Sequence, residues 1–188
     1  MRFAFIVTAV LLVALTPVSQ AQDEWDPELI ALLREAAKEV GGFADHFDAQ
    51  VWLRDMSARL ERQVKYPEER IEILKRVHHE AQRAELRPEL VLAVIDVESN
   101  FDRFAISVAS ARGLMQIMPF WLAEIGRPDD NLMQIETNLQ FGCTILKYYI
   151  EIEKGNLPRA LGRYNGSLGK RKYPNKVLDK LRLKWFRA

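Results

Sequence analysis

The chain has 188 residues, 48% of them hydrophobic and 28% charged, which is enough for one domain with a hydrophobic core and a soluble surface. The formal net charge of +1 excludes a strongly acidic or basic protein, and we expect no nucleic-acid partner. The single cysteine, Cys143, excludes an internal disulfide, and its apolar surroundings predict a small buried side chain.

Residues 1–21 are typical of a signal peptide. Arg2 precedes an uncharged apolar run over residues 3–15, and the small residues Ser19 and Ala21 fit cleavage after Ala21. The apolar run is short for a membrane span, so a retained signal anchor is the weaker alternative. The sequence therefore predicts an exported protein whose mature chain begins near Gln22.

The rest of the chain is predicted to be all-α. Apolar residues recur at spacings of three and four, and no convincing alternation typical of a strand is present. Prolines and glycines mark most of the helix ends. Helices are predicted over residues 27–40, 45–63, 67–86, 88–98, 119–125, 135–153, 157–163 and 174–185. In the second of these, Phe47, Val51, Leu53 and Leu60 supply the apolar positions.

Glu98 is the first candidate for a chemical role. It follows Val94 by four positions and Ile95 by three, so it lies on the apolar stripe near the end of its helix. Burial disfavours the charged form of a carboxyl group and raises its pKa, as a general acid at neutral pH requires. From this spacing alone, a glutamate that turns to solvent at a helix end is the simpler interpretation.

An ordered set of motifs follows Glu98. Ser99 comes directly after the acid and Ser107 nine positions after it, before Gly113-Leu114-Met115-Gln116 and Pro119. The later motifs are Asn138 with Gly142, then Arg163-Tyr164-Asn165-Gly166, and finally Tyr173-Pro174-Asn175-Lys176-Val177. Together they resemble the lytic transglycosylases of the soluble lytic transglycosylase (SLT) type over roughly residues 88–177. One departure is Gly166-Ser167, where the family often has Ala-Gly.

The resemblance implies an all-α, lysozyme-like (goose-type) catalytic domain over residues 87–188 with a small helical extension over residues 22–86. The extension is either a docking surface for a secretion or cell-wall partner or a helical brace. The family works on murein, so the export signal implies a periplasmic location. The resemblance implies no cofactor and no metal, and His46, His78 and His79 form no convincing metal cluster.

The resemblance also implies an activity. Glu98 acts as both acid and base in cleaving the bond between N-acetylmuramic acid and N-acetylglucosamine of peptidoglycan glycan strands, with a 1,6-anhydromuramyl product. The alternatives are a hydrolytic muramidase on the same fold, which needs a second carboxylate and water, and a murein-binding assembly factor without turnover. The other nearby acids, which we expect to be non-essential, are Asp96, Asp102, Asp129 and Asp130.

Five further residues are implied to bind substrate, namely Ser107, Met115, Gln116, Tyr164 and Asn165. Ser107 and Gln116 have polar groups suited to sugar amides and hydroxyls, and Tyr164 offers a ring that stacks on a pyranose. Each has a structural alternative: Ser107 caps a loop, Met115 and Tyr164 fill the core, and Asn165 fixes the loop after it.

The end of the chain is basic. Residues 170–187 contain eight lysines and arginines and one acid, Asp179. Such a segment is able to touch an anionic polymer or a membrane surface, although a solvated helix face is the simpler interpretation.

Overall fold

The structure is a computed structural model that describes residues 27–39, 41, 45–127 and 129–186. The predicted signal peptide and the expected helix cap Asp26 lie outside these residues. Within them, the regular secondary structure is helical apart from two isolated bridges that join Ile106 to Arg112 and Arg112 to Ile117. The predicted all-α class is therefore confirmed. No helix in the described ranges combines the length and apolarity that a membrane span requires.

The helices follow the predicted order. They are α1 (Pro27–Glu39), α2 (His46–Leu60), α3 (Pro67–Arg83), α4 (Pro88–Glu98), α5 (Trp121–Ile125), α6 (Ile135–Ile152), α7 (Leu157–Tyr164) and α8 (Lys172–Lys180), with a final π-helical turn η1 (Leu181–Trp185). Pro67 and Pro88 begin α3 and α4, where the missing N–H of proline costs no helical hydrogen bond. The observed bounds lie within a few residues of those predicted.

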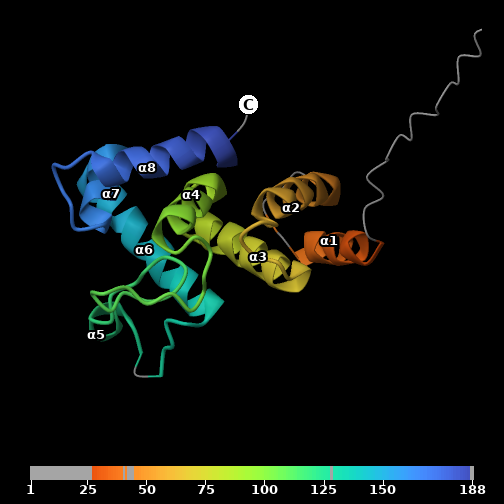
Figure 1. Cartoon of the computed structure of the whole chain (residues 1–188), viewed down its shortest axis with the longest axis horizontal. Coiled ribbons are helices and arrows are strands. Elements are labelled where there is room, and N and C mark those ends of the chain that lie inside the picture. The colour runs from red at the N-terminus through yellow and green to blue at the C-terminus, as the bar shows by residue number, and fades with distance from the viewer. Residues whose placement is uncertain (1–26, 40, 42–44, 128, 187–188) are drawn as a thin grey trace, which may run out of the picture.

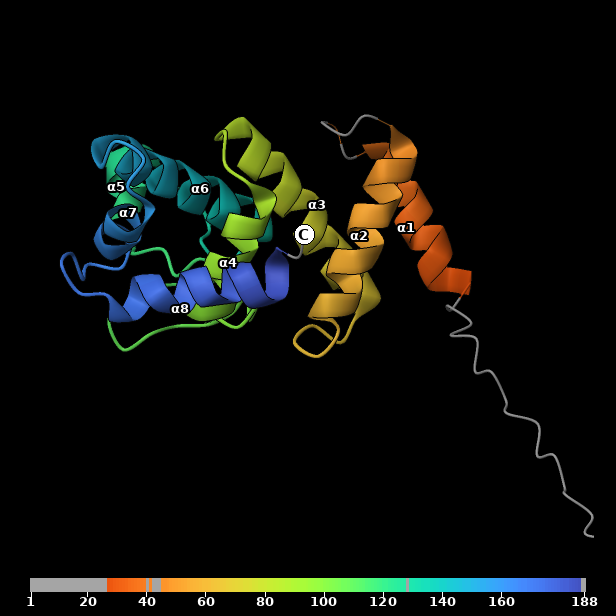
Figure 2. The ribbon, with the colours of Figure 1, turned by 90° about the horizontal axis from the view of Figure 1, so that it is seen from above.

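Helix α4 lies at the centre of the molecule. Figures 1 and 2 show α1 and α2 at one end and α5, α6 and α7 at the other, with α3 and α4 between them. Every residue from Leu90 to Asp96 is buried, because α4 packs against α3, α8 and η1. Helix α3 packs on α1 and α2 as well as on α4 and α6, so it joins the two ends.

Helix α2 departs from the prediction in its buried face. Leu53 and Leu60 are buried as expected, but Phe47 and Val51 are exposed. The buried stripe runs through Ala49, Leu53, Met56, Ser57 and Leu60. Phe47 and Val51 are four residues apart and share a face that this stripe does not include. Helix α2 therefore buries fewer of its large apolar side chains in the core than the sequence predicts.

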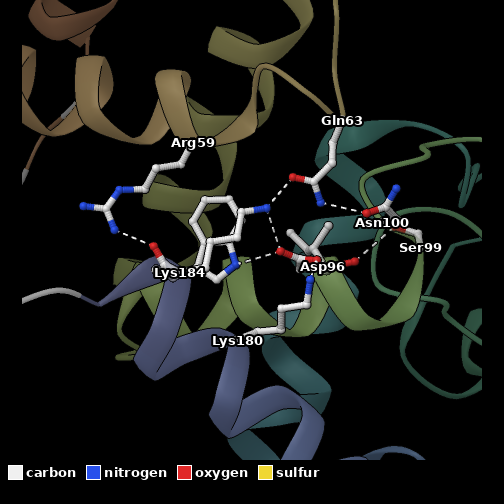
Figure 3. Close-up of polar contacts among 9 residues, drawn as sticks. Arg59, Gln63, Asp96, Ser99, Asn100, Lys180 and Lys184 are labelled. Carbon is white, nitrogen blue, oxygen red and sulfur yellow. Dashed lines mark hydrogen bonds and ion pairs between the residues drawn. The ribbon is translucent and has the colours of Figure 1, made fainter.

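A buried carboxylate ties the end of the chain to α4. The Asp96 side chain is 0% exposed and lies 2.7 Å from Lys180 Nζ and 2.8 Å from Lys184 Nζ. Trp185 Nε1 donates a hydrogen bond of 3.1 Å to the same carboxylate. Figure 3 shows these groups converging on Asp96 from α8 and η1. Burial alone raises the pKa of Asp96, but the hydrogen bonds and charges of the two lysines outweigh it and hold the pKa below its usual range.

The same network extends to α2. Lys184 Nζ donates to Gln63 Oε1, and Gln63 Nε2 donates to Asn100 Oδ1 at 2.8 Å. Arg59 Nη1 donates to the backbone carbonyl of Lys184 at 2.5 Å (Figure 3). Helix α2 and the turn that follows it are therefore hydrogen-bonded to η1.

Replacing Asp96 with Asn tests this network. The change removes the charge that pairs with both lysines but keeps the side-chain volume. We expect the free energy of unfolding to fall by about 2–3 kcal/mol near neutral pH. This is less than the usual loss when a fully buried ion pair is broken, because both lysines are partly exposed to water. The stabilisation by Asp96 exists above the ordinary aspartate pKa and is lost as the pH falls through the lowered pKa. The difference in unfolding free energy between wild type and variant should therefore shrink in acid. Urea unfolding of both proteins at neutral and at acidic pH would measure it.

Asp179→Asn provides the matched control. Asp179 lies on α8 next to Lys180, but it is exposed, and within the described part of the chain it pairs with Arg182 alone, at 3.2 Å. We expect that variant to lose less than about 1 kcal/mol, as is usual for a surface pair. An equal loss in the two variants would show that the buried position of Asp96 has no special importance.

Candidate active site

Glu98 is the last residue of α4 and faces a cavity of about 300 Å³. Ser99 is the C-cap of this helix, and its backbone N–H donates to the carbonyl of Ile95. The cavity lies between this end of α4, the loop after α7 and the beginning of α8. Its lining consists of Val97, Glu98, Asn165, Ser167, Lys170, Lys172, Tyr173 and Lys176. Glu98 is the single carboxylate among these described lining residues.

Burial shifts the carboxyl group of Glu98 toward its acid form. Burial raises the pKa of Glu98 to about 7, and the hydrogen bond from Tyr173 partly opposes that rise. Tyr173 Oη donates to Glu98 Oε1 at 2.6 Å. Burial and the charge of Glu98 raise the pKa of Tyr173 itself, so it keeps the proton that it donates. Glu98 therefore exchanges a proton near neutral pH beside a fixed hydrogen-bond donor.

The loop after α4 is fixed behind the site by three side chains. Ser99 Oγ donates to the carbonyl of Leu114 at 2.8 Å. Tyr164 Oη donates to the carbonyl of Met115, also at 2.8 Å. Asn138 of α6 accepts from the Met115 N–H at 2.8 Å and donates to the carbonyls of Arg112 and Leu132. These bonds join the loop to α4, α6 and α7.

Two glycines allow the loop to approach α6 this closely. Gly113 has a φ of +73°, and a Cβ there would lie 2.3 Å from Asn138 Nδ2. On α6 itself, a Cβ at Gly142 would lie 2.2 Å from Met115 Sδ. The glycines of the Gly-Leu-Met-Gln and Asn-x-x-x-Gly motifs are therefore required by packing and backbone geometry.

The residues implied to bind substrate divide into two groups. Asn165 lines the cavity with Glu98. Ser107 instead accepts a hydrogen bond from the Ala111 N–H at 3.0 Å, which is the loop-capping alternative. Gln116 Nε2 donates to the carbonyls of Ala105 and Gly113, so its amide nitrogen also holds the loop.

Met115 and Tyr164 complete the set. Met115 is 0% exposed and packs on Gly142, so its side chain belongs to the core and offers no wall to a ligand. That is a correction of the substrate-binding role, and it follows from the close approach of the loop to α6. The ring of Tyr164 is partly buried beneath the loop, and its hydroxyl is used in the bond to Met115.

Some residues of the site have no role that the sequence alone reveals. Tyr173 belongs to the Tyr-Pro motif, but only the fold brings it to Glu98 across 75 positions of sequence. Asn138 and Ser99 are also motif residues, and their anchoring role depends on contacts with a distant loop. Ser167 Oγ is buried at the cavity and has no hydrogen-bond partner within the described part of the chain.

The other candidate groups lie elsewhere. Asp96 is held by its two lysines, and Asp102 is an exposed loop residue whose Oδ1 accepts from the Phe104 N–H at 2.8 Å. Cys143 is buried as predicted, and burial raises the pKa of its thiol. Among the described residues, no group of three or more His, Cys, Asp or Glu side chains is arranged to hold a metal ion.

Comparison with known proteins gives three similarities. Residues 76–184, more than half of the chain, match the Transglycosylase SLT domain family. A stretch of 39 residues is 46% identical to proteins named membrane-bound lytic murein transglycosylase C from Actinobacillus pleuropneumoniae serotypes 5b and 3, and it covers 21% of this chain and 11% of each relative. The structure of an inactive mutant of the lytic transglycosylase Slt from Pseudomonas aeruginosa aligns with a TM-score of 0.46 and 22% identity.

That alignment covers 86% of this chain and 32% of the Pseudomonas protein, so this chain spans about a third of that enzyme and about a tenth of the curated relatives. The family match includes Glu98 and every motif on which the resemblance in sequence depends. The resemblance is confirmed, and the chain belongs to the Transglycosylase SLT domain family.

Proposed function

We propose that this chain is a murein lytic transglycosylase that cleaves the β-1,4 bond between N-acetylmuramic acid and N-acetylglucosamine without water. The observation that carries the proposal is the position of Glu98. It is the single carboxylate among the described residues that line the cavity, and burial holds its pKa at about 7. One group able to give and take a proton at neutral pH is what an intramolecular cleavage requires.

The proposed reaction returns Glu98 to its starting state. Glu98 donates its proton to the glycosidic oxygen, and the bond from that oxygen to the muramyl anomeric carbon breaks. The muramyl ring becomes oxocarbenium-like, and the acetamido group of the sugar stabilises it. The Glu98 carboxylate then removes the proton of the 6-hydroxyl, whose oxygen bonds to the anomeric carbon. The products are a 1,6-anhydromuramyl end and a free N-acetylglucosamine end.

Tyr173 supports both steps as the hydrogen-bond donor to Glu98. Its bond to Oε1 stabilises the carboxylate that forms when Glu98 gives up its proton. The hydroxyl of Ser167 and the side-chain amide of Asn165 line the same cavity and supply polar groups for sugar hydroxyls and amides. The bonds of Ser99, Asn138 and Tyr164 fix the loop after α4, which follows Glu98 in the chain.

A hydrolytic muramidase is the rival reaction. It requires a second carboxylate across the scissile bond to activate water. The described lining offers none, and Asp96 is already neutralised by lysines. The lyase reaction therefore has the better support.

The proposed function extends to location and domain roles. We propose that residues 1–21 direct export and that the chain acts in the periplasm. We also propose that residues 22–86 brace the catalytic domain of residues 87–188. The bonds from Arg59 and Gln63 to Lys184 support the brace, because they tie the N-terminal helices to the end of the chain.

Glu98→Gln tests the assignment of the acid. The amide has the same shape but gives up no proton, so we expect kcat for murein cleavage to fall by about 10²–10⁴-fold or more. Mass spectrometry of digested murein sacculi would show anhydro-muropeptides, one water lighter than hydrolysis products, from the wild type alone. Asp102→Asn is the control and should retain full activity. Reducing-end products from the wild type would instead identify a hydrolase.

Tyr173→Phe tests the hydrogen bond at the acid. The first step needs protonated Glu98, so wild-type activity should fall as the pH rises through about 7. Loss of the Tyr173 donor removes an interaction that favours the carboxylate, so the pKa of Glu98 rises and the alkaline limb moves by about one pH unit to higher pH. A pH profile of kcat would measure this, with a loss of about tenfold at the optimum. An unmoved limb would disprove the coupling.

A further inference from the structure

Three lysines surround the mouth of the cavity that contains Glu98. Lys170 lies in the loop between α7 and α8, and Lys172 and Lys176 lie four residues apart on one face of α8. All three line the cavity and are exposed to solvent. Figure 1 shows this loop and α8 folding back toward the end of α4. We call Lys170, Lys172 and Lys176 the lysine rim.

Within the described residues, the lysine rim has no paired counter-charge. None of its three side chains forms an ion pair or hydrogen bond with another described residue, whereas Lys180 and Lys184 on the next turns are bound to Asp96. The lining carboxylate, Glu98, offsets at most part of one of these charges near neutral pH, because burial raises its pKa to about 7. The mouth therefore carries an unbalanced positive charge directly beside the proposed catalytic acid.

Among the described residues, the rim lysines form no ion pair with Glu98, and burial and the Tyr173 hydrogen bond account for the raised pKa of Glu98. The three lysines line the cavity yet are exposed to solvent, so they are accessible to groups attached to a bound sugar chain. Exposed charges at a rim act mainly on recognition and on the rate of encounter, and salt screens them.

We infer that the lysine rim binds the carboxylates of peptides attached to muramic acid, so that the enzyme selects peptide-bearing anionic glycan strands over neutral ones. This inference rests on the proposed function, since it assigns the occupant of the same cavity. Murein peptides carry carboxylates close to the muramyl ring, and that ring must lie at Glu98 for cleavage. Lysines in the adjacent loop and first turns of α8 are placed to meet those carboxylates.

The test uses the full chain and two substrates of equal length. Soluble murein strands are first acetylated on their amines, which leaves the carboxylates as their only charges. Half of the sample then has those carboxylates capped as methylamides. The test variant combines Lys170→Gln, Lys172→Gln and Lys176→Gln. The matched control combines Lys38→Gln, Lys65→Gln and Lys154→Gln, three exposed lysines outside the cavity lining.

We expect the wild type and the control to cleave the anionic strands with a kcat/KM about tenfold higher than the capped strands, mainly through KM. The rim variant should lose this preference, so that its kcat/KM is about equal on the anionic and the capped strands. Added salt should reduce the preference of the wild type in the same direction. Binding of the two substrates to the Glu98→Gln protein should show the same roughly tenfold preference for the anionic strands as kcat/KM does. The Glu98→Gln protein that also carries the rim substitutions should bind both substrates equally.

Other results would overturn the inference. An equal loss on both substrates would show that the rim lysines act on the fold or on the sugar. An equal loss in the control would show a general charge effect. Rim-dependent binding to vesicles of anionic phospholipid, without any effect on the strands, would assign the rim to a membrane surface. Failure of the proposed function looks different: the wild type would cleave neither substrate, while the binding ratio would still report on the rim.

Discussion

The structure depends on the contrast between two carboxylates that lie two residues apart on one helix. Asp96 and Glu98 are both drawn into the molecule by α4, which is buried along its whole middle. Asp96 meets Lys180 and Lys184, so it stays charged and binds the end of the chain. Glu98 forms no ion pair with another described residue and accepts a hydrogen bond from the hydroxyl of Tyr173, and burial raises its pKa. The different surroundings thus give Asp96 a structural role and Glu98 its proposed chemical role, although both are carboxyl groups.

The terminal helix produces both environments. Its first turn carries Tyr173 to Glu98, and its last turns carry the lysines and Trp185 to Asp96. Because α8 and η1 continue one another, the network at Asp96 also sets where Tyr173 lies. Arg59 of α2 and Gln63 in the turn after it form bonds with Lys184 of η1 (Figure 3). The N-terminal helices therefore support the geometry of the acid, although they supply none of the described residues that line its cavity.

The sequence predicts the helices and the position of Glu98 on its helix well, because both depend on local information. Prolines, glycines and apolar spacing mark most helix bounds to within a few residues, and the position of Glu98 on the apolar stripe follows from helical periodicity. Contacts between segments that are distant in the sequence cannot be predicted from these local patterns. Phe47 and Val51 are apolar yet exposed, Met115 fills the core beside Gly142, and Tyr173 reaches Glu98 only after α8 folds back. The motifs identify these positions without separating anchoring residues from lining residues.

Burial of the acid also explains how the lysine rim stays free for a ligand. An ionised Glu98 would attract Lys170, Lys172 or Lys176 into the cavity, and such a pair would lower the pKa of the acid and block the mouth. With its pKa raised to about 7, Glu98 carries only part of a negative charge near neutral pH, less than the positive charge of the three exposed lysines. The cavity therefore has an acid at its floor and a net positive charge at its mouth. An anionic substituent is attracted to the rim, while the sugar at the floor meets an acid that is able to give up a proton.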